Sequence, residues 1–296
     1  MPRPGAPDTI EKIMLLPLGG FGGTVAKTAT SPLERIRVLA QTGGGEKGIR
    51  ATASAIMEAE GVKGFWRGNF TNCLRIFPAK GVLFACNDVY KDLLRQVFRF
   101  KGPDPKILAF GSGACAGITA CILTYPLDFA RTRLAGVTGR DIGLGGVLRE
   151  AIKENGYKSL YRGCWPTILG AVPYEGIKFG VYGYFSENGA NEMTVQSKMF
   201  YGALSGVTAG VFVYPNDTVR KIMQISGSQG DHHGQRVYSS FLDCYRTTYR
   251  KGGLGRFYHG ALPYLLRSVP NAAIQFSVYE SLKTMVIKKH RSGDFS

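Results

Sequence analysis

Acidic residues are scarce in this chain of 296 residues, with 21 Asp and Glu against 37 Lys and Arg and a formal charge of +16. Charge of either sign is missing altogether from residues 107–127 and 199–216, and from the shorter stretch 13–26. Uncharged apolar stretches of about 18 residues are candidate membrane spans. Because these stretches are also rich in small residues, they favour packed membrane helices over the core of a soluble protein.

Signals for other classes of protein are missing too. The six cysteines form no CxxC pair and have no histidine at metal-ligand spacing, which excludes a zinc finger or a disulfide framework as the basis of the fold. The glycines at 111–117 have the wrong spacing for a dinucleotide loop. No cluster of basic residues forms a nucleic-acid-binding arm, and the first twelve residues contain no targeting signal that can be read. We therefore expect no metal, no cofactor, no nucleic acid and no enzymatic activity.

One element occurs three times, at residues 19–37, 113–131 and 202–220. Each copy reads Gly, three residues, Gly, eight residues, Pro, one residue, an acid, two residues and Arg. The GxxxG pairs predict faces on which helices pack closely. Three copies in fixed register predict a single body, 1–296, with threefold pseudosymmetry and repeats at about 10–98, 104–190 and 195–289.

Each repeat is expected to contain two spanning helices. The first helices of the repeats are expected at 12–41, 106–135 and 197–225, and the second at 69–96, 165–187 and 261–289. The second helices carry charged side chains, which are costly in lipid and should therefore face a water-filled interior.

Acids and bases that follow the prolines predict a gate at one end of that interior. Within a repeat the two groups are three residues apart and could pair locally. The symmetry favours pairing between repeats instead, as Glu34–Arg131, Asp128–Arg220 and Asp217–Arg37. Gln41 and Gln224, each nine residues after its proline, could brace this ring. Ala135, at the equivalent position of the second repeat, could not.

A second, weaker gate is expected at the opposite end. Its candidate residues are Asp88, Lys91, Glu280 and Lys283 on the first and last of the second helices. The corresponding positions of the middle repeat hold Gly183 and Ser186, so this ring is incomplete.

The loops inside the repeats share an ending of their own: Gly, four residues, an aromatic residue, a base and Gly. It occurs at 60–68, 155–163 and 252–260, with His259 in place of the base in the third copy. These loops are basic, whereas the loops between repeats are not, so their side of the protein suits an anionic membrane surface.

Together, the three proline motifs and loop endings resemble those of the mitochondrial carrier family, over nearly the whole chain. The resemblance implies an all-α membrane protein of six tilted transmembrane helices with short helices on the matrix side. It also implies alternating access between two salt-bridge gates, in a multi-pass protein of the mitochondrial inner membrane. Carriers of this type also occur in peroxisomal and plastid membranes. Expected partners are a small anionic solute and membrane lipid, with cardiolipin as a candidate, around a monomeric carrier.

Within the family, the sequences around Lys27 and Arg75 are similar to the adenine nucleotide and coenzyme A branch. The resemblance places substrate-binding residues at Lys27, Arg75, Gly170, Tyr174 and Arg267. Lysine and arginines would hold phosphates, Gly170 would leave a slot for adenine, and Tyr174 would stack on it. Lys27 also breaks the threefold symmetry, because its equivalents are Cys121 and Gly210.

Two departures leave the substrate open. Residues 220–225 read RKIMQI, unlike the RRRMMM of ADP/ATP exchangers. Glu175 stands where the family has an arginine, and it would repel phosphates unless Lys178 neutralises it. The alternatives are therefore a carrier of an adenine-bearing phosphorylated anion, a carrier of another small anion such as a carboxylate or amino acid, and a basic soluble repeat protein.

Overall fold

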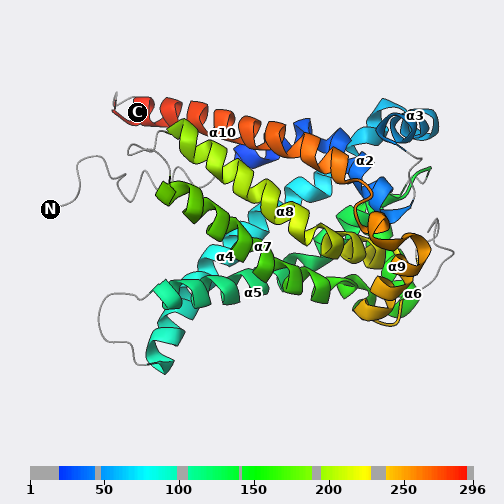
Figure 1. Ribbon diagram of the computed structural model, residues 1–296, viewed down its shortest axis with the longest axis horizontal. Helices are drawn as coiled ribbons and strands as arrows, with labels where there is room; N and C mark the ends of the chain where they lie inside the picture. The colour runs from blue at the N-terminus through cyan, green and yellow to red at the C-terminus, as the bar shows by residue number, and fades with distance from the viewer. Residues whose placement is uncertain are drawn as a thin grey trace.

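The computed structural model describes residues 20–43, 48–98, 106–139, 142–188, 195–227 and 238–291, and all regular secondary structure in these ranges is helical (Figure 1). Residues 20–29 form a helix that is separated by a turn at Thr30 from α2 (Ser31–Thr42). Pro32 stands in the first turn of α2, where its missing N–H leaves no hydrogen bond unmade. Residues 12–19 of the expected first helix lie outside the described residues.

Five long helices complete the expected set: α4 (Asn69–Val97), α5 (Lys106–Gly136), α7 (Cys164–Asn188), α8 (Val195–Ile225) and α10 (Ala261–Arg291). Each begins and ends within two residues of the sequence prediction. At a rise of ~1.5 Å per residue they are long enough to cross a hydrocarbon core of about 30 Å. The all-α prediction is therefore confirmed.

Short helices gather at one end of the molecule, where Figure 1 shows α3, α6 and α9 beside the ends of the long helices. They are α3 (Ile49–Glu60), α6 (Leu144–Asn155) and α9 (Phe241–Phe257), and a 3-10 helix follows each of the first two, η1 (Val62–Trp66) and η2 (Tyr157–Tyr161). Each short helix buries an apolar side chain against the helix that carries its repeat's proline motif. Ile56 of α3, for example, packs with Ile36 and Leu39.

Hydropathy alone identifies fewer membrane-spanning helices than the threefold sequence repeat predicts. Within the described residues one segment, Phe110–Gly136, is long and apolar enough to qualify as a membrane span, with a mean hydropathy of 1.3. Charged side chains of α4, α8 and α10 face the interior of the bundle, as expected, whereas Glu175 and Lys178 of α7 do not.

The GxxxG prediction is wrong for the glycines that can be tested. A Cβ at Gly117 or Gly202 would meet nothing within 4 Å, and at Gly23, Gly113 and Gly206 it would be in van der Waals contact with one side-chain atom and with no backbone of another helix. Gly22 is instead the glycine of close helix contact, since its Cβ would lie 3.1 Å from the carbonyl oxygen of Gln275. Gly113 and Gly117 leave space between helices rather than closing it.

Helices pair mainly across repeat boundaries. α4 packs along α5, α7 along α8, and α10 against α2. At the end away from the short helices these pairs splay apart (Figure 1). This arrangement places the acid and base motifs at the narrow end of a central cavity.

Candidate functional site

Three ion pairs join the repeats at the narrow end of the bundle. Arg131 Nη2 lies 3.0 Å from Glu34 Oε1, and Arg37 Nη2 lies 2.7 Å from Asp217 Oδ2. Arg220 donates to Asp128 in the third pair. Each pair links one repeat to another, as the symmetry argument expects, and the local contact between Arg37 and Glu34 is longer, at 3.5 Å.

Two glutamines donate to acids of this ring. Gln41 Nε2 lies 3.2 Å from Asp217 Oδ2, and Gln224 Nε2 lies 3.1 Å from Asp128 Oδ2. Both glutamines are fully buried. Their amides therefore support two of the three pairs, and the Glu34–Arg131 pair has no glutamine.

Lys221 is a member of the ring that the sequence analysis missed. Its Nζ lies 3.0 Å from Asp217 Oδ2, 2.7 Å from Gln41 Oε1 and 4.0 Å from Glu34 Oε1. It is almost fully buried, so these acceptors are what compensate its charge. The available signal was its position four residues after Asp217, which puts both side chains on one helix face.

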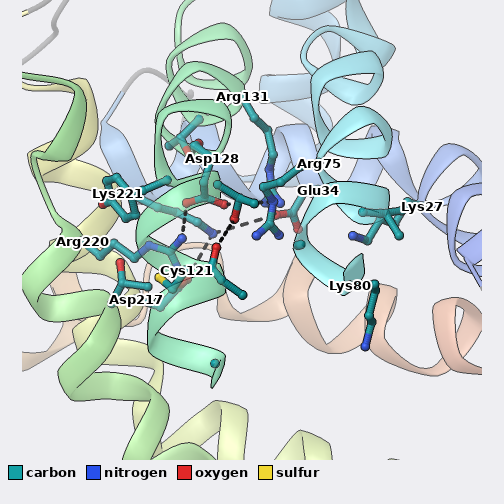
Figure 2. Close-up of a pocket in the computed structure, with 18 of the residues that line it drawn as sticks. Lys27, Glu34, Arg75, Lys80, Cys121, Asp128, Arg131, Asp217, Arg220 and Lys221 are labelled. Carbon is teal, nitrogen blue, oxygen red and sulfur yellow. Dashed lines mark hydrogen bonds and ion pairs between the residues drawn. The ribbon is translucent and has the colours of Figure 1, made fainter. Parts of the chain in front are cut away.

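Above the ring lies a central cavity of about 490 Å³, shown in Figure 2. Eight Lys and Arg side chains line it against three carboxylates, which leaves a surplus of five positive charges. Such a cavity attracts anions, because low-dielectric walls focus the field of the cations that line it.

Lys27 and Lys80 carry charge that no other group neutralises. Within the described part of the chain neither makes a hydrogen bond or an ion pair, and Figure 2 shows both beside the dashed network rather than in it. Lys27 was expected here. Lys80 was missed as a site residue, although its spacing from Ile76 and Leu83, which also line the cavity, puts all three on one helix face.

The two arginines expected to bind substrate are engaged by the ring. Arg75 Nε lies 3.6 Å from Asp128 Oδ1, and Arg267 Nε lies 3.1 Å from Glu34 Oε2. Both line the central cavity, as expected, but they face it as members of ion pairs.

The slot expected at Gly170 is filled. A Cβ there would overlap the side-chain amide of Asn216 on α8, because Gly170 is buried against that helix. Gly170 and Tyr174 instead line a side cavity of about 290 Å³, which shares Arg37, Asp217 and Arg220 with the central one. A planar group could enter this side cavity beside the Tyr174 ring.

Glu175 does not face the central cavity. Its side chain is 45% exposed and pairs with Lys178 Nζ at 3.2 Å, as the sequence suggested. It lines a second crevice, between α5 and α7. Glu175 is therefore not among the acids that line the cavity beside Lys27.

The four residues of the expected second gate lie near the splayed end of the bundle. Asp88 is exposed and has no ion pair within the described residues, and Glu280 is half-buried. The side chain of Lys283 lies outside the described residues. In this conformation the narrow-end ring is formed and the cavity opens at the other end.

His259, which replaces the base of the third loop ending, is held next to a cation. Its Nδ1 lies 2.8 Å from Arg256 Nη1. Burial, and then the charge of Arg256, lower the pKa of His259. Arg256 also donates to the carbonyl oxygen of Ala40, so it joins the third loop to the first repeat.

No group of His, Cys, Asp and Glu side chains that could hold a metal ion occurs among the residues described. The site is made of cations, three acids and two amides, and it is suited to binding an anion.

Comparisons with known proteins agree with this geometry. The model of the family described as mitochondrial carrier protein matches residues 12–98, 103–190 and 191–290. The chain is 32% identical to a mitochondrial adenine nucleotide transporter of Arabidopsis thaliana, over 93% of this chain and 88% of the relative. It is 33% identical to the mitochondrial carrier protein CoAc1 of the same plant (90% and 87%) and 34% identical to ADP/ATP translocase 3 of Sus scrofa (90% and 95%). The fold repeats its long helical segments, six in all, ion pairs join the repeats in a ring, and the family model matches all three repeats. The chain therefore belongs to the mitochondrial carrier family, whose members are transporters.

Proposed function

We propose that this protein exchanges an adenine-bearing phosphorylated anion, an adenine nucleotide or coenzyme A, across the mitochondrial inner membrane by alternating access. Relatives named mitochondrial adenine nucleotide transporter and ADP/ATP translocase 3 support an adenine nucleotide as the substrate class, and a relative named mitochondrial carrier protein CoAc1 is similar at 33% identity. A chloroplast envelope relative of Arabidopsis thaliana keeps a plastid membrane as the alternative location.

The observation that carries the proposal is the uncompensated charge of Lys27 and Lys80 in a cavity with five surplus positive charges. Phosphate oxygens form charge-assisted hydrogen bonds with such groups. The side cavity beside Tyr174 is where the adenine ring would lie.

Binding at this site would weaken the narrow-end gate. Arg75 and Arg267 line the cavity while paired with Asp128 and Glu34, so a phosphate that draws them away removes partners from two acids of the ring. A substrate moves a conformational equilibrium only through its different affinities for the two states. Competition for these two arginines would supply that difference. The second gate would then form as the narrow-end gate opens; its residues are Asp88, Lys91, Glu280 and Lys283.

A carrier of another small anion, a carboxylate or an amino acid, is the second candidate. Two observations favour it. Gly170, where an adenine slot was expected, is packed against Asn216. Glu175 stands where the family has an additional arginine, and it pairs with Lys178. A small carboxylate needs Lys27 but not the side cavity.

Uptake into liposomes decides between these functions. Purified protein would be reconstituted into liposomes loaded with ADP and, separately, into liposomes loaded with malate, and the uptake of labelled ADP, ATP, coenzyme A and malate would be measured in both. We expect exchange with the adenine compounds that Lys27→Gln abolishes. Exchange of malate alone would overturn the adenine proposal and support the second candidate.

A further inference from the structure

A second large cavity lies between α5 and α7. It has a volume of about 530 Å³, and its walls are mainly apolar, formed by Phe110, Gly113 and Gly117 of α5 and by Ile168, Val172 and Phe179 of α7. The side chains of Phe110, Val172 and Phe179 are more than half exposed, so the crevice also opens toward the lipid side of the bundle.

Small residues keep this crevice open, as a comparison with the third repeat shows. Tyr264 stands four residues after Gly260, and its ring fills the space beside Gly210, where a Cβ would overlap the phenol oxygen. In the second repeat the equivalent positions hold Thr167 and Cys121. A space closed by an aromatic ring in one repeat is therefore open in the other.

The crevice and the central cavity share part of their walls. Gly117, Cys121 and Thr167 line both, so only these three small residues stand between the two spaces at this point. The central cavity offers cations, whereas the charged groups at the crevice are Glu175 and its partner Lys178. Together the two spaces thus have a cationic part for an anionic group and an apolar part without surplus charge.

We propose that this crevice is a binding site for the apolar chain of the substrate, which makes acyl thioesters of coenzyme A a substrate class of this carrier. The inference rests on the proposed function, since the phosphates and adenine occupy the central and side cavities. The pantetheine arm, which separates the phosphates from the thioester, passes Cys121, and the acyl chain lies between α5 and α7.

Chain length gives the proposal its measurable consequence. Each methylene removed from water adds roughly 0.8 kcal/mol, or up to about fourfold in affinity. The dissociation constants of coenzyme A and its acetyl, butyryl and hexanoyl thioesters would be measured by calorimetry on the full chain in lipid nanodiscs. Empty nanodiscs correct for partition of the ligand into lipid. We expect affinity to rise with chain length in the unmodified protein.

Ala114→Phe tests the location, because Ala114 lines the crevice but neither of the other two cavities. We expect it to abolish the dependence on chain length while coenzyme A binds as before. Val172→Trp narrows the same space from α7 and covers the case in which Ala114→Phe fails to fold. The matched control is Ala273→Phe, at an exposed position of α10 outside all three cavities, which should keep the full dependence.

Two results would overturn the proposal. One is a chain-length dependence that is unchanged in both crevice variants. The other is an affinity of the unmodified protein that does not depend on acyl-chain length. If the crevice variants then also lose co-purifying lipid, the occupant of the crevice is a membrane acyl chain. If neither ADP nor coenzyme A binds to any variant, the proposed function itself fails. That outcome is distinct from normal binding of coenzyme A without an effect of the chain.

Discussion

Gly163 packs directly against the carbonyl oxygen of Arg220, so closely that a Cβ on Gly163 would lie 3.0 Å from that oxygen. The same contact recurs around the bundle, between Gly68 and Arg131 and between Gly260 and Arg37, each at 2.9 Å. All three glycines have φ near +80°. The final glycine of each loop ending therefore seats its loop on the backbone of the next repeat's gate arginine.

Gly163→Ala should destabilise the protein. The left-handed backbone costs a residue with a Cβ about 1–2 kcal/mol, and crowding against the backbone of Arg220 adds to this. Thermal unfolding in detergent would measure the loss. Gly139→Ala is the control, because Gly139 also has a positive φ, of +73°, but its Cβ would meet nothing within 4 Å. Equal losses in the two variants would show that the contact with Arg220 contributes nothing.

Features that repeat three times could be predicted from the sequence, whereas contacts that do not repeat could not. Helix ranges and ring pairings follow from patterns that repeat three times, and symmetry turns a local spacing into a contact between repeats. The contacts of Arg75 with Asp128 and of Arg267 with Glu34 are related by this symmetry, but the equivalent position of the second repeat holds Gly170, so the pattern is not repeated three times. Gly170 shows the same limit, since whether a glycine leaves space or admits a neighbour depends on the opposing side chain, here Asn216.

The Asp217–Arg37 pair should be replaceable by its reverse. Breaking a buried pair on one side costs roughly 3–5 kcal/mol, so Asp217→Arg and Arg37→Asp should each abolish most transport. The double variant should restore part of the liposome exchange. Rescue should be larger with Lys221→Gln, because Lys221 Nζ lies 3.0 Å from Asp217 and would repel an arginine there. If no combination restores exchange, the pair does not act as a gate.

Lys27→Gln should weaken binding of the transported anion by about tenfold or more, since a hydrogen bond to a charged group contributes roughly 1.5–3 kcal/mol. Lys80→Gln should have a smaller effect, because the Lys80 side chain is more exposed to water. Calorimetry with ADP would measure both. Lys63→Gln, on the exposed surface of η1, removes the same charge far from the cavity and should leave affinity unchanged. A similar loss in all three variants would mean that net charge, not position, sets the affinity.

Acidification should destabilise the loop that contains His259. Burial and Arg256 lower the pKa of His259 in the folded state, so below pH about 6.5 the unfolded chain takes up the proton first. Stability is therefore highest above pH 6.5, falls as the pH drops below that value, and levels off once it passes the lowered folded-state pKa. His259→Gln cannot titrate, so its thermal midpoint, measured from pH 8 to pH 5, should depend less on pH than that of the unmodified protein. Parallel curves for the two proteins would assign the acid sensitivity to other groups. Arg256→Gln provides the complementary measurement, since without the neighbouring charge the decline should be shallower while His259 is still present.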